Sequence, residues 1–139
     1  MWLTKRVFFS LRRVMEDELR PYDLTTAQLG ILGVLRDAPG RSGAEISRDV
    51  LITPQAVMVA LRSLEARGLV TRTSDPDHAR VIRNVLTPAA KRLVDRCAAI
   101  CLAAQDQLLT ALDTNERDTL VKLLQRLDEA SPASEAGGD

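Results

Sequence analysis

Aromatic residues, histidine and cysteine are scarce in this chain of 139 residues. Aromatic residues make up 3% of the chain, so leucine, valine, isoleucine and alanine must fill the core, which favours closely packed helices over a sheet sandwich. Two cysteines and one histidine provide neither the ligands of a structural zinc site nor the disulfide framework of a small secreted protein. We therefore expect a mainly helical protein that holds no metal and no other cofactor.

Long uncharged runs are lacking as well. The longest, residues 24–35 and 50–61, stop at twelve residues, well short of the roughly 18 to 20 that cross a bilayer. Lys5, Arg6 and Arg12 interrupt the hydrophobic stretch that a signal peptide would need. We expect a cytoplasmic protein with no membrane segment.

Net charge is zero, but the total conceals an uneven distribution. Residues 41–92 contain nine basic and five acidic side chains, a net charge of +4, and the rest of the chain therefore has a net charge of −4. A polyanion would be attracted to the middle of the chain rather than to its ends.

Five sites present a side-chain oxygen where the first turn of a helix needs a hydrogen-bond acceptor. They are the capping boxes Thr25 with Gln28, Ser42 with Glu45 and Asp113 with Glu116, and the pairs Thr53–Pro54 and Thr87–Pro88. Pro21, Pro39 with Gly40, and Gly68 are typical of helix ends. The pattern predicts helices near 2–20, 26–37, 43–50, 54–67, 88–112 and 114–129.

Residues 69–86 do not fit a helix. Segments 69–73 and 80–86 are rich in β-branched residues and flank a polar turn that contains Asp75, Pro76 and Asp77, which predicts a hairpin. A helix, a short helix, a further helix and a hairpin, in that order, are the plan of a winged helix-turn-helix. In that plan the later helix, here 54–67, enters the major groove of DNA.

The predicted helix 54–67 has two distinct faces. At 100° per residue, Val57, Ala60, Leu61 and Leu64 point inward, whereas Gln55, Val59, Arg62 and Ala66 point outward, with Met58 and Ser63 between them. Gln55 suits an adenine edge, Val59 and Met58 suit thymine methyl groups, and Arg62 suits guanine or a phosphate. The alternative for Val59 and Met58 is burial against another element.

The residues of this helix and hairpin resemble those of the MarR family, and the resemblance extends over nearly the whole chain. It is carried by 53–57, Leu61, Leu64, Glu65 and 67–70, and in the hairpin by 75–81, Leu86 and Thr87. His78 stands where the family often has aspartate, and Ala90 stands where glycine usually follows the Leu-Thr pair. The first departure removes an acid that often braces the wing arginine, for which Asp75 or Asp77 is a possible substitute.

The resemblance implies a winged helix-turn-helix that is mainly α with a small β-hairpin wing and long terminal dimerisation helices. A single domain would span 1–139, with a DNA-binding lobe at 24–87, dimerisation helices at 1–23 and 88–130, and a flexible tail at 131–139. It also implies a homodimeric, ligand-responsive repressor of transcription that binds a pseudo-palindromic operator in double-stranded DNA.

By the same resemblance, Arg80 enters the minor groove, where narrow A·T-rich segments attract a cation. The residues expected at the DNA are Ser42, Thr53, Pro54, Gln55, Met58, Val59, Arg62, Arg72, His78 and Arg80. The alternative for Arg80 is a surface ion pair with Asp75 or Asp77, and the alternative for His78 is simple solvation.

The terminal helices have apolar stripes that exceed the needs of one small core. Leu93, Cys97, Ile100, Cys101, Ala104 and Leu108 form one stripe, Leu120, Leu123, Leu124 and Leu127 a second, and Leu3, Val7, Leu11 and Val14 a third. The resemblance implies that these helices intertwine two subunits and that a small, often aromatic effector binds between them and the DNA-binding lobe. Candidate lining residues are Phe8, Leu11, Arg12, Tyr22 and Leu32, with a core role as the alternative for the apolar ones.

Cys97 and Cys101 lie four residues apart on one predicted helix face, a spacing compatible with either a redox switch or simple core packing. Packing is favoured because an apolar stripe offers no cation to lower the pKa of a thiol.

Two other classes of function remain to be compared. A winged helix can serve as a protein interaction module that never touches DNA, which the zero net charge permits, although the basic residues clustered in 41–92 favour DNA. An enzyme is disfavoured, because the sequence has no glycine-rich phosphate loop, no nucleophile with a histidine base and no cluster of metal ligands.

Overall fold

The computed structural model of the chain describes residues 2–78 and 80–130. The expected tail at 131–139 lies outside the described residues. In chain order the elements are α1 (Trp2–Leu19), the 3₁₀ turn η1 (Arg20–Tyr22), α2 (Thr26–Asp37), α3 (Gly43–Val50), α4 (Pro54–Ala66), β1 (Val70–Ser74), β2 (Ile82–Leu86), α5 (Pro88–Leu108), the 3₁₀ turn η2 (Leu109–Ala111) and α6 (Thr114–Glu129). The expected fold, mainly helical with one hairpin, is confirmed.

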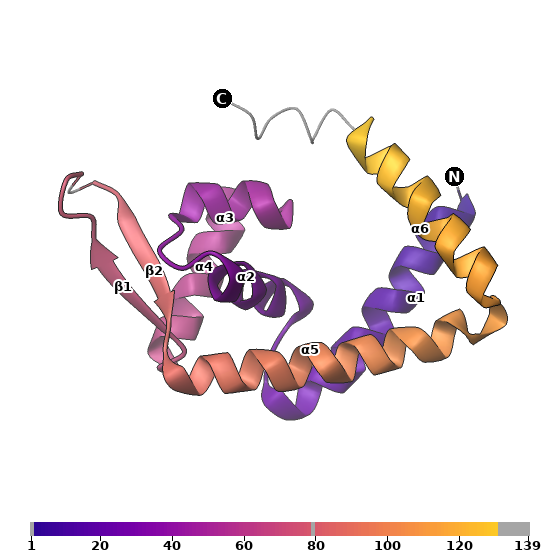
Figure 1. Cartoon of the computed structure of the whole chain (residues 1–139). Coiled ribbons are helices and arrows are strands. Elements are labelled where there is room, and N and C mark those ends of the chain that lie inside the picture. Colours follow the sequence, from indigo (N-terminus) through magenta and orange to yellow (C-terminus); the bar gives the residue numbers. More distant parts are fainter. Residues whose placement is uncertain (1, 79, 131–139) are drawn as a thin grey trace.

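The molecule has two parts, which Figure 1 shows side by side. Helices α2, α3 and α4 and the β1–β2 hairpin form a compact lobe, and α1, α5 and α6 extend away from it. α1 packs along α5, and the first half of α5 also packs against α2. The lobe therefore packs against the pair of long helices α1 and α5.

Local capping explains where the helices begin. The three predicted capping boxes are present at α2, α3 and α6, and Thr53 and Thr87 cap α4 and α5 ahead of a proline. At its other end, α4 closes on Gly68 with φ 67°, with the amides of Gly68 and Leu69 bonded to the carbonyls of Glu65 and Leu64. This is the paired bonding of a Schellman motif, in which glycine accepts the left-handed conformation without strain.

Two predicted boundaries were wrong by more than one residue. α5 ends at Leu108 rather than at 112, because the chain tightens into η2 and Leu112 is already extended where Asp113 caps α6. β2 begins at Ile82 rather than at Arg80, because the Val81 amide donates to the carbonyl of His78 and its carbonyl accepts from Asp75. His78, Arg80 and Val81 therefore belong to the turn of the hairpin.

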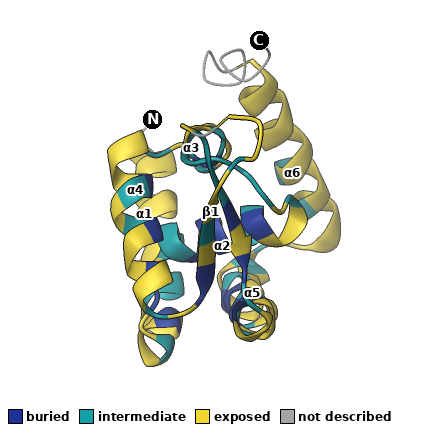
Figure 2. Cartoon of the chain, turned by 90° about the vertical axis from the view of Figure 1, so that its left-hand side faces the viewer, coloured by how far each residue is buried: buried dark blue, intermediate teal, exposed yellow. Residues whose placement is uncertain are grey.

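The core lies inside the lobe and beneath it. Leu19, Ile31, Leu35, Ile46, Leu61, Leu64 and Val94 are among its fully buried side chains. Of the described residues of α1, only Leu19 is buried, and within Thr114–Glu129 none is. Figure 2 shows this as a dark centre with α6 and much of α1 left exposed. No helix in the described part of the chain is long and apolar enough to cross a membrane.

Candidate nucleic-acid interface

α4 presents a short mixed face on the outside of the lobe. Val57, Leu61 and Leu64 are fully buried, as the helical spacing predicts, whereas Gln55 and Arg62 on the opposite side are exposed. Val59 is 65% exposed between them, so the alternative that it packs inside this chain is wrong. Met58 is half-buried and its sulfur lies over Gly43 of α3, so the packing alternative applies in part to this residue.

The turn between α3 and α4 fixes the angle of that face. Leu51 ends α3 in the left-handed conformation with φ 54°, and the Ser47 hydroxyl donates to the carbonyl of Ile52 at 2.6 Å. Thr53 then accepts the amide of Ala56 and starts α4, with Thr53 and Pro54 exposed at its N-terminus. A helix N-terminus with free amides and a mixed apolar and polar face is the arrangement that reads a major groove.

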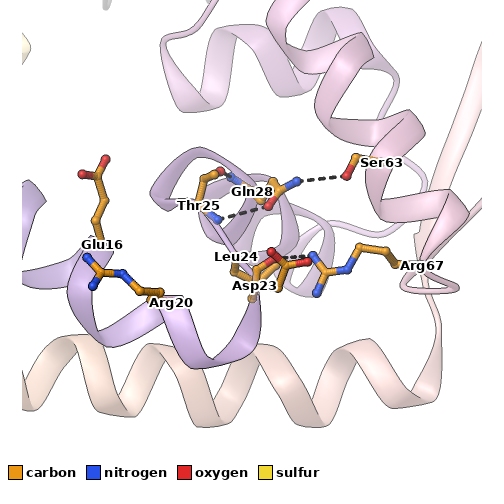
Figure 3. Close-up of a pocket in the computed structure, with 8 residues that line it drawn as sticks. All are labelled: Glu16, Arg20, Asp23, Leu24, Thr25, Gln28, Ser63 and Arg67. Carbon is orange, nitrogen blue, oxygen red and sulfur yellow. Dashed lines mark hydrogen bonds between the residues drawn. The ribbon is translucent and has the colours of Figure 1, made fainter.

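Two pockets adjoin α4. A cavity of about 580 Å³ runs along its outward face and the start of α2, with Gln55, Val59, Thr25, Gln28 and Ser63 among its lining residues. The second, about 380 Å³, lies between α1, α2 and the C-terminal end of α4 (Figure 3). Its polar lining includes Glu16, Arg20 and Arg67, and the bond from Gln28 Nε2 to Ser63 Oγ at 3.3 Å belongs to both pockets.

The wing is the β1–β2 hairpin, paired antiparallel from Val70 with Leu86 to Ser74 with Ile82. Arg80 and His78 are exposed in the turn beyond the strands. Asp75, one suggested partner of Arg80, is bonded to Arg83 at 2.6 Å, and within residues 2–78 and 80–130 no carboxylate pairs with Arg80. The Arg83 guanidinium, followed by the Asp77 amide, holds the pKa of Asp75 below its usual range.

Arg72 and Ser42, two of the residues expected at the DNA, make contacts within the chain instead. The Arg72 side chain is 14% exposed, pairs with Glu65 of α4 at 3.3 Å, and has a buried Nε without a hydrogen-bond partner. Ser42 caps α3, and its amide and hydroxyl both donate to Glu45. These bonds, the amide first, hold the pKa of Glu45 at about 2. Neither residue lies on the outward face of α4.

Sequence reasoning missed three residues that position this interface. Asn84 is buried in β2 and donates to the Arg41 carbonyl at 2.7 Å, and Arg83 beside it bonds Asp75. Arg67, at the end of α4, donates to the carbonyls of Tyr22 at 2.9 Å and Asp23 at 2.5 Å. The partners of Asn84 and Arg67 lie more than forty residues away in the sequence and leave no local signal.

The five residues expected around an effector do not gather in either pocket. Leu32 is fully buried in the core, Leu11 and Tyr22 are half-buried, and Phe8 is exposed. Arg12 pairs with Glu16 at 2.7 Å on the surface of α1. Leu32 therefore belongs to the core, and Tyr22 packs against the edge of the core.

Cys97 and Cys101 are both buried in α5. Burial raises the pKa of each thiol, more than the nearby charge of Arg96 lowers it at Cys97. The pair belongs to the hydrophobic core, as the packing interpretation predicted.

Comparison with known proteins agrees with this geometry. A sequence profile described as the MarR family matches residues 22–81. Over 126 residues the chain is 32% identical to the HTH-type transcriptional repressor Rv2887 of Mycobacterium tuberculosis, with 91% of each chain covered. Structures of Rv2887 have been solved in complex with salicylic acid and with p-aminosalicylic acid.

Two further solved structures share the fold. Bordetella bronchiseptica BpsR, studied for the regulation of its DNA binding by 6-hydroxynicotinic acid, has a TM-score of 0.85 and 25% identity, with 93% of this chain and 92% of that chain covered. The transcriptional repressor CouR, bound to a 23-mer DNA duplex, has a TM-score of 0.84 and 28% identity, with 91% and 89% covered. Likeness along nearly the whole length, together with the winged helix-turn-helix, shows that this protein is a member of the MarR family.

Proposed function

We propose that this protein is a homodimeric transcriptional repressor that binds a pseudo-palindromic operator in double-stranded DNA and releases it on binding a small aromatic acid. The observation that carries the proposal is the outward face of α4, where an exposed valine lies between an exposed glutamine and an exposed arginine on a helix whose other side is buried. Such a face is complementary to base edges and thymine methyl groups.

Charge supports DNA as the partner of this face. The basic excess of residues 41–92 lies in the lobe, the wing and the start of α5, whereas residues 93–139 contain four basic and nine acidic side chains, a net charge of −5. Arg62 on α4 and Arg80 on the wing are exposed and belong to two separate elements of the lobe. In our proposal Arg62 contacts the major groove and Arg80 the adjacent minor groove, as in other winged helices that read both.

The terminal helices support the homodimer. Trp2, Val7 and Phe9 of α1 and Leu123, Leu124 and Leu127 of α6 are large apolar side chains that stay exposed in the single chain. Large apolar side chains left exposed on two long helices support an interface with a second chain. A twofold axis through it would present two α4 helices about one DNA turn apart.

The effector class is carried over from relatives. Rv2887 is 31% identical in its complex with p-aminosalicylic acid, and BpsR is described with 6-hydroxynicotinic acid, both small aromatic acids. We propose that this chain responds to the same chemical class. The test titrates the operator complex with these acids and with the matched pair salicylic acid and salicylamide, which differ in the carboxylate. We expect an acid, but not the amide, to weaken DNA binding by about 5- to 150-fold.

The experiment that tests DNA binding selects duplexes from a random pool with the full-length protein. We expect enrichment of an inverted repeat whose half-sites lie about 10 base pairs apart, with affinity that falls steeply with salt. Arg80→Ala should weaken binding to the selected operator by about 1–3 kcal/mol and reduce the salt slope by about one. Arg96→Ala, which removes the same charge from the exposed surface of α5 outside residues 41–92, is the control. A pool that stays random, with weak and salt-insensitive binding, would favour the protein interaction module instead.

A further inference from the structure

Arg83 of β2 lies between acidic side chains of two different elements. Its Nε donates to Asp75 Oδ2 at 2.6 Å, at the start of the wing turn. Its Nη1 lies 3.4 Å from the Gly40 carbonyl and 3.5 Å from Glu45 Oε2, at the N-terminus of α3. The contact with Glu45 is long for a hydrogen bond and acts as an ion pair. One guanidinium therefore joins the wing to the helix-turn-helix.

Both carboxylates are themselves held in place. Asp75 is 11% exposed, and its other oxygen accepts the amides of Asp77 at 2.9 Å and His78 at 3.0 Å, so the wing turn is wound around this side chain. Glu45 is bonded to Ser42 and to Arg41. Because each acid is part of a fixed local structure, the contact through Arg83 fixes the two structures relative to each other.

The base of the wing is attached separately. The Gly40 amide donates to the Asn84 carbonyl at 2.9 Å, and the Asn84 amide and side chain donate to the Arg41 carbonyl. Strand pairing ends at Ser74 with Ile82. Beyond that pair, the turn is tied to the rest of the lobe through Asp75 and Arg83, and Arg80 lies in that turn.

We propose that Arg83 is a positioning residue for DNA recognition: its bonds to Asp75 and Glu45 hold the wing at the angle from which Arg80 reaches the minor groove. This role rests on the proposed function. The competing role for Arg83, which is 37% exposed, is a direct contact with a DNA phosphate.

Two substitutions that change charge in opposite directions separate the roles. Arg83→Gln removes a positive charge, and Asp75→Asn removes a negative one while keeping an oxygen for the turn amides. A positioning role predicts that both weaken binding to the selected operator, each by about tenfold and by no more than Arg80→Ala does. A phosphate contact predicts that Arg83→Gln weakens binding whereas Asp75→Asn leaves it unchanged or strengthens it. Arg96→Gln, on the exposed surface of α5 outside residues 41–92, is the control for charge alone, and melting temperatures check that the variants fold.

A double-mutant cycle measures the coupling between Arg83 and Arg80 in operator binding. Neither a purely structural role of Arg83 nor a direct phosphate contact predicts such coupling. If Arg83 acts through Arg80, the variant with both Arg83→Gln and Arg80→Ala should bind within about twofold of Arg80→Ala alone, and its salt slope should be the same. Additive losses, or an Asp75→Asn variant that binds as tightly as wild type, would overturn the positioning role. Should Arg83→Gln fail to fold, Arg83→Lys serves in its place, because lysine keeps the charge but lacks the fork that reaches both acids.

Failure of the proposed function would look different. In that case the random pool would yield no operator, so no cycle could be measured and both proposals would fall together. A normal loss on Arg80→Ala combined with additivity would leave the proposed function intact and remove the role of Arg83 alone.

Discussion

Glu45 combines two tasks in one carboxylate, since it completes the cap of α3 and faces Arg41 and Arg83. The bonds from Ser42 hold its pKa at about 2 instead of 4.5. Folding thus favours the ionised form, so the stabilisation is fully present above about pH 4.5 and is lost as the pH falls toward 2.

The variant Glu45→Gln tests this dependence. Glutamine at this position can still complete a capping box but has no charge, so we expect it to cost about 1 kcal/mol of unfolding free energy at pH 7, an amount that shrinks toward zero near pH 2. Denaturant unfolding across this pH range provides the measurement. If the unfolding free energies of wild type and variant differed by the same amount at every pH, the lowered pKa of Glu45 would not contribute to stability.

Leu51 holds a conformation that favours glycine. It has φ 54°, and its side chain is 69% exposed, so little apolar burial compensates for the left-handed backbone. We expect Leu51→Gly to raise the unfolding free energy by about 1 kcal/mol, because the clash of Cβ with the following carbonyl disappears. Leu51→Ala keeps Cβ and should show no such gain. Thermal or denaturant unfolding of the two variants side by side decides the matter.

At the scale of the elements, the two arginines of α4 and its C-terminal cap differ in their contacts. Arg62 is exposed on the outward face, whereas Arg67 bonds two carbonyls where η1 meets α2. We expect Arg67→Ala to lower the unfolding free energy by about 1–2 kcal/mol, because two charge-assisted hydrogen bonds are lost. Arg62→Ala should leave stability nearly unchanged and weaken operator binding. Equal effects of the two substitutions on stability would show that the bonds of Arg67 contribute nothing.

Helix starts were predictable because their signals are local. A capping oxygen, a glutamate or glutamine three residues on, and a proline at the first helical position all lie within one turn, and the starts of α2 to α6 agree with the sequence reading. The end of α5 and the start of β2 depend on hydrogen bonds of neighbouring turns, which periodicity does not contain.

The outward face of α4 was predictable from helical spacing, and the tertiary bonds around it were not. Gln55, Val59 and Arg62 lie outward as expected, whereas the bonds of Arg67 and Arg83 join residues about forty positions apart. The expected effector residues illustrate the same limit. An apolar position such as Leu32 has the same periodicity whether it faces a pocket or the core, and here it faces the core.

For the whole molecule, we propose that the exposed apolar side chains of α1 and α6 form the dimer interface. We expect Leu124→Glu to convert the proposed dimer to a monomer at micromolar concentration, because it places a charge in an apolar interface. Gln125→Glu adds the same charge one position further along α6, away from the apolar stripe, and should leave the dimer intact. Light scattering gives the mass of each. A wild-type monomer, or a dimeric Leu124→Glu, would contradict the proposed interface.

The two covalent connections between the lobe and the terminal helices meet at one place. Arg67 donates hydrogen bonds to the carbonyls of Tyr22 and Asp23, and Thr87 donates hydrogen bonds to the carbonyls of Gly68 and Leu69. The segment before α2 and the segment before α5 are therefore both hydrogen-bonded to the C-terminal end of α4. This shared attachment adds to the packing of α2 on α5 and to the Arg36–Asp95 pair in holding the lobe on the long helices. If the proposed function holds, a chimera that receives residues 24–87 from a relative, with all of these contacts preserved, should acquire the donor's half-site preference and keep the recipient's half-site spacing.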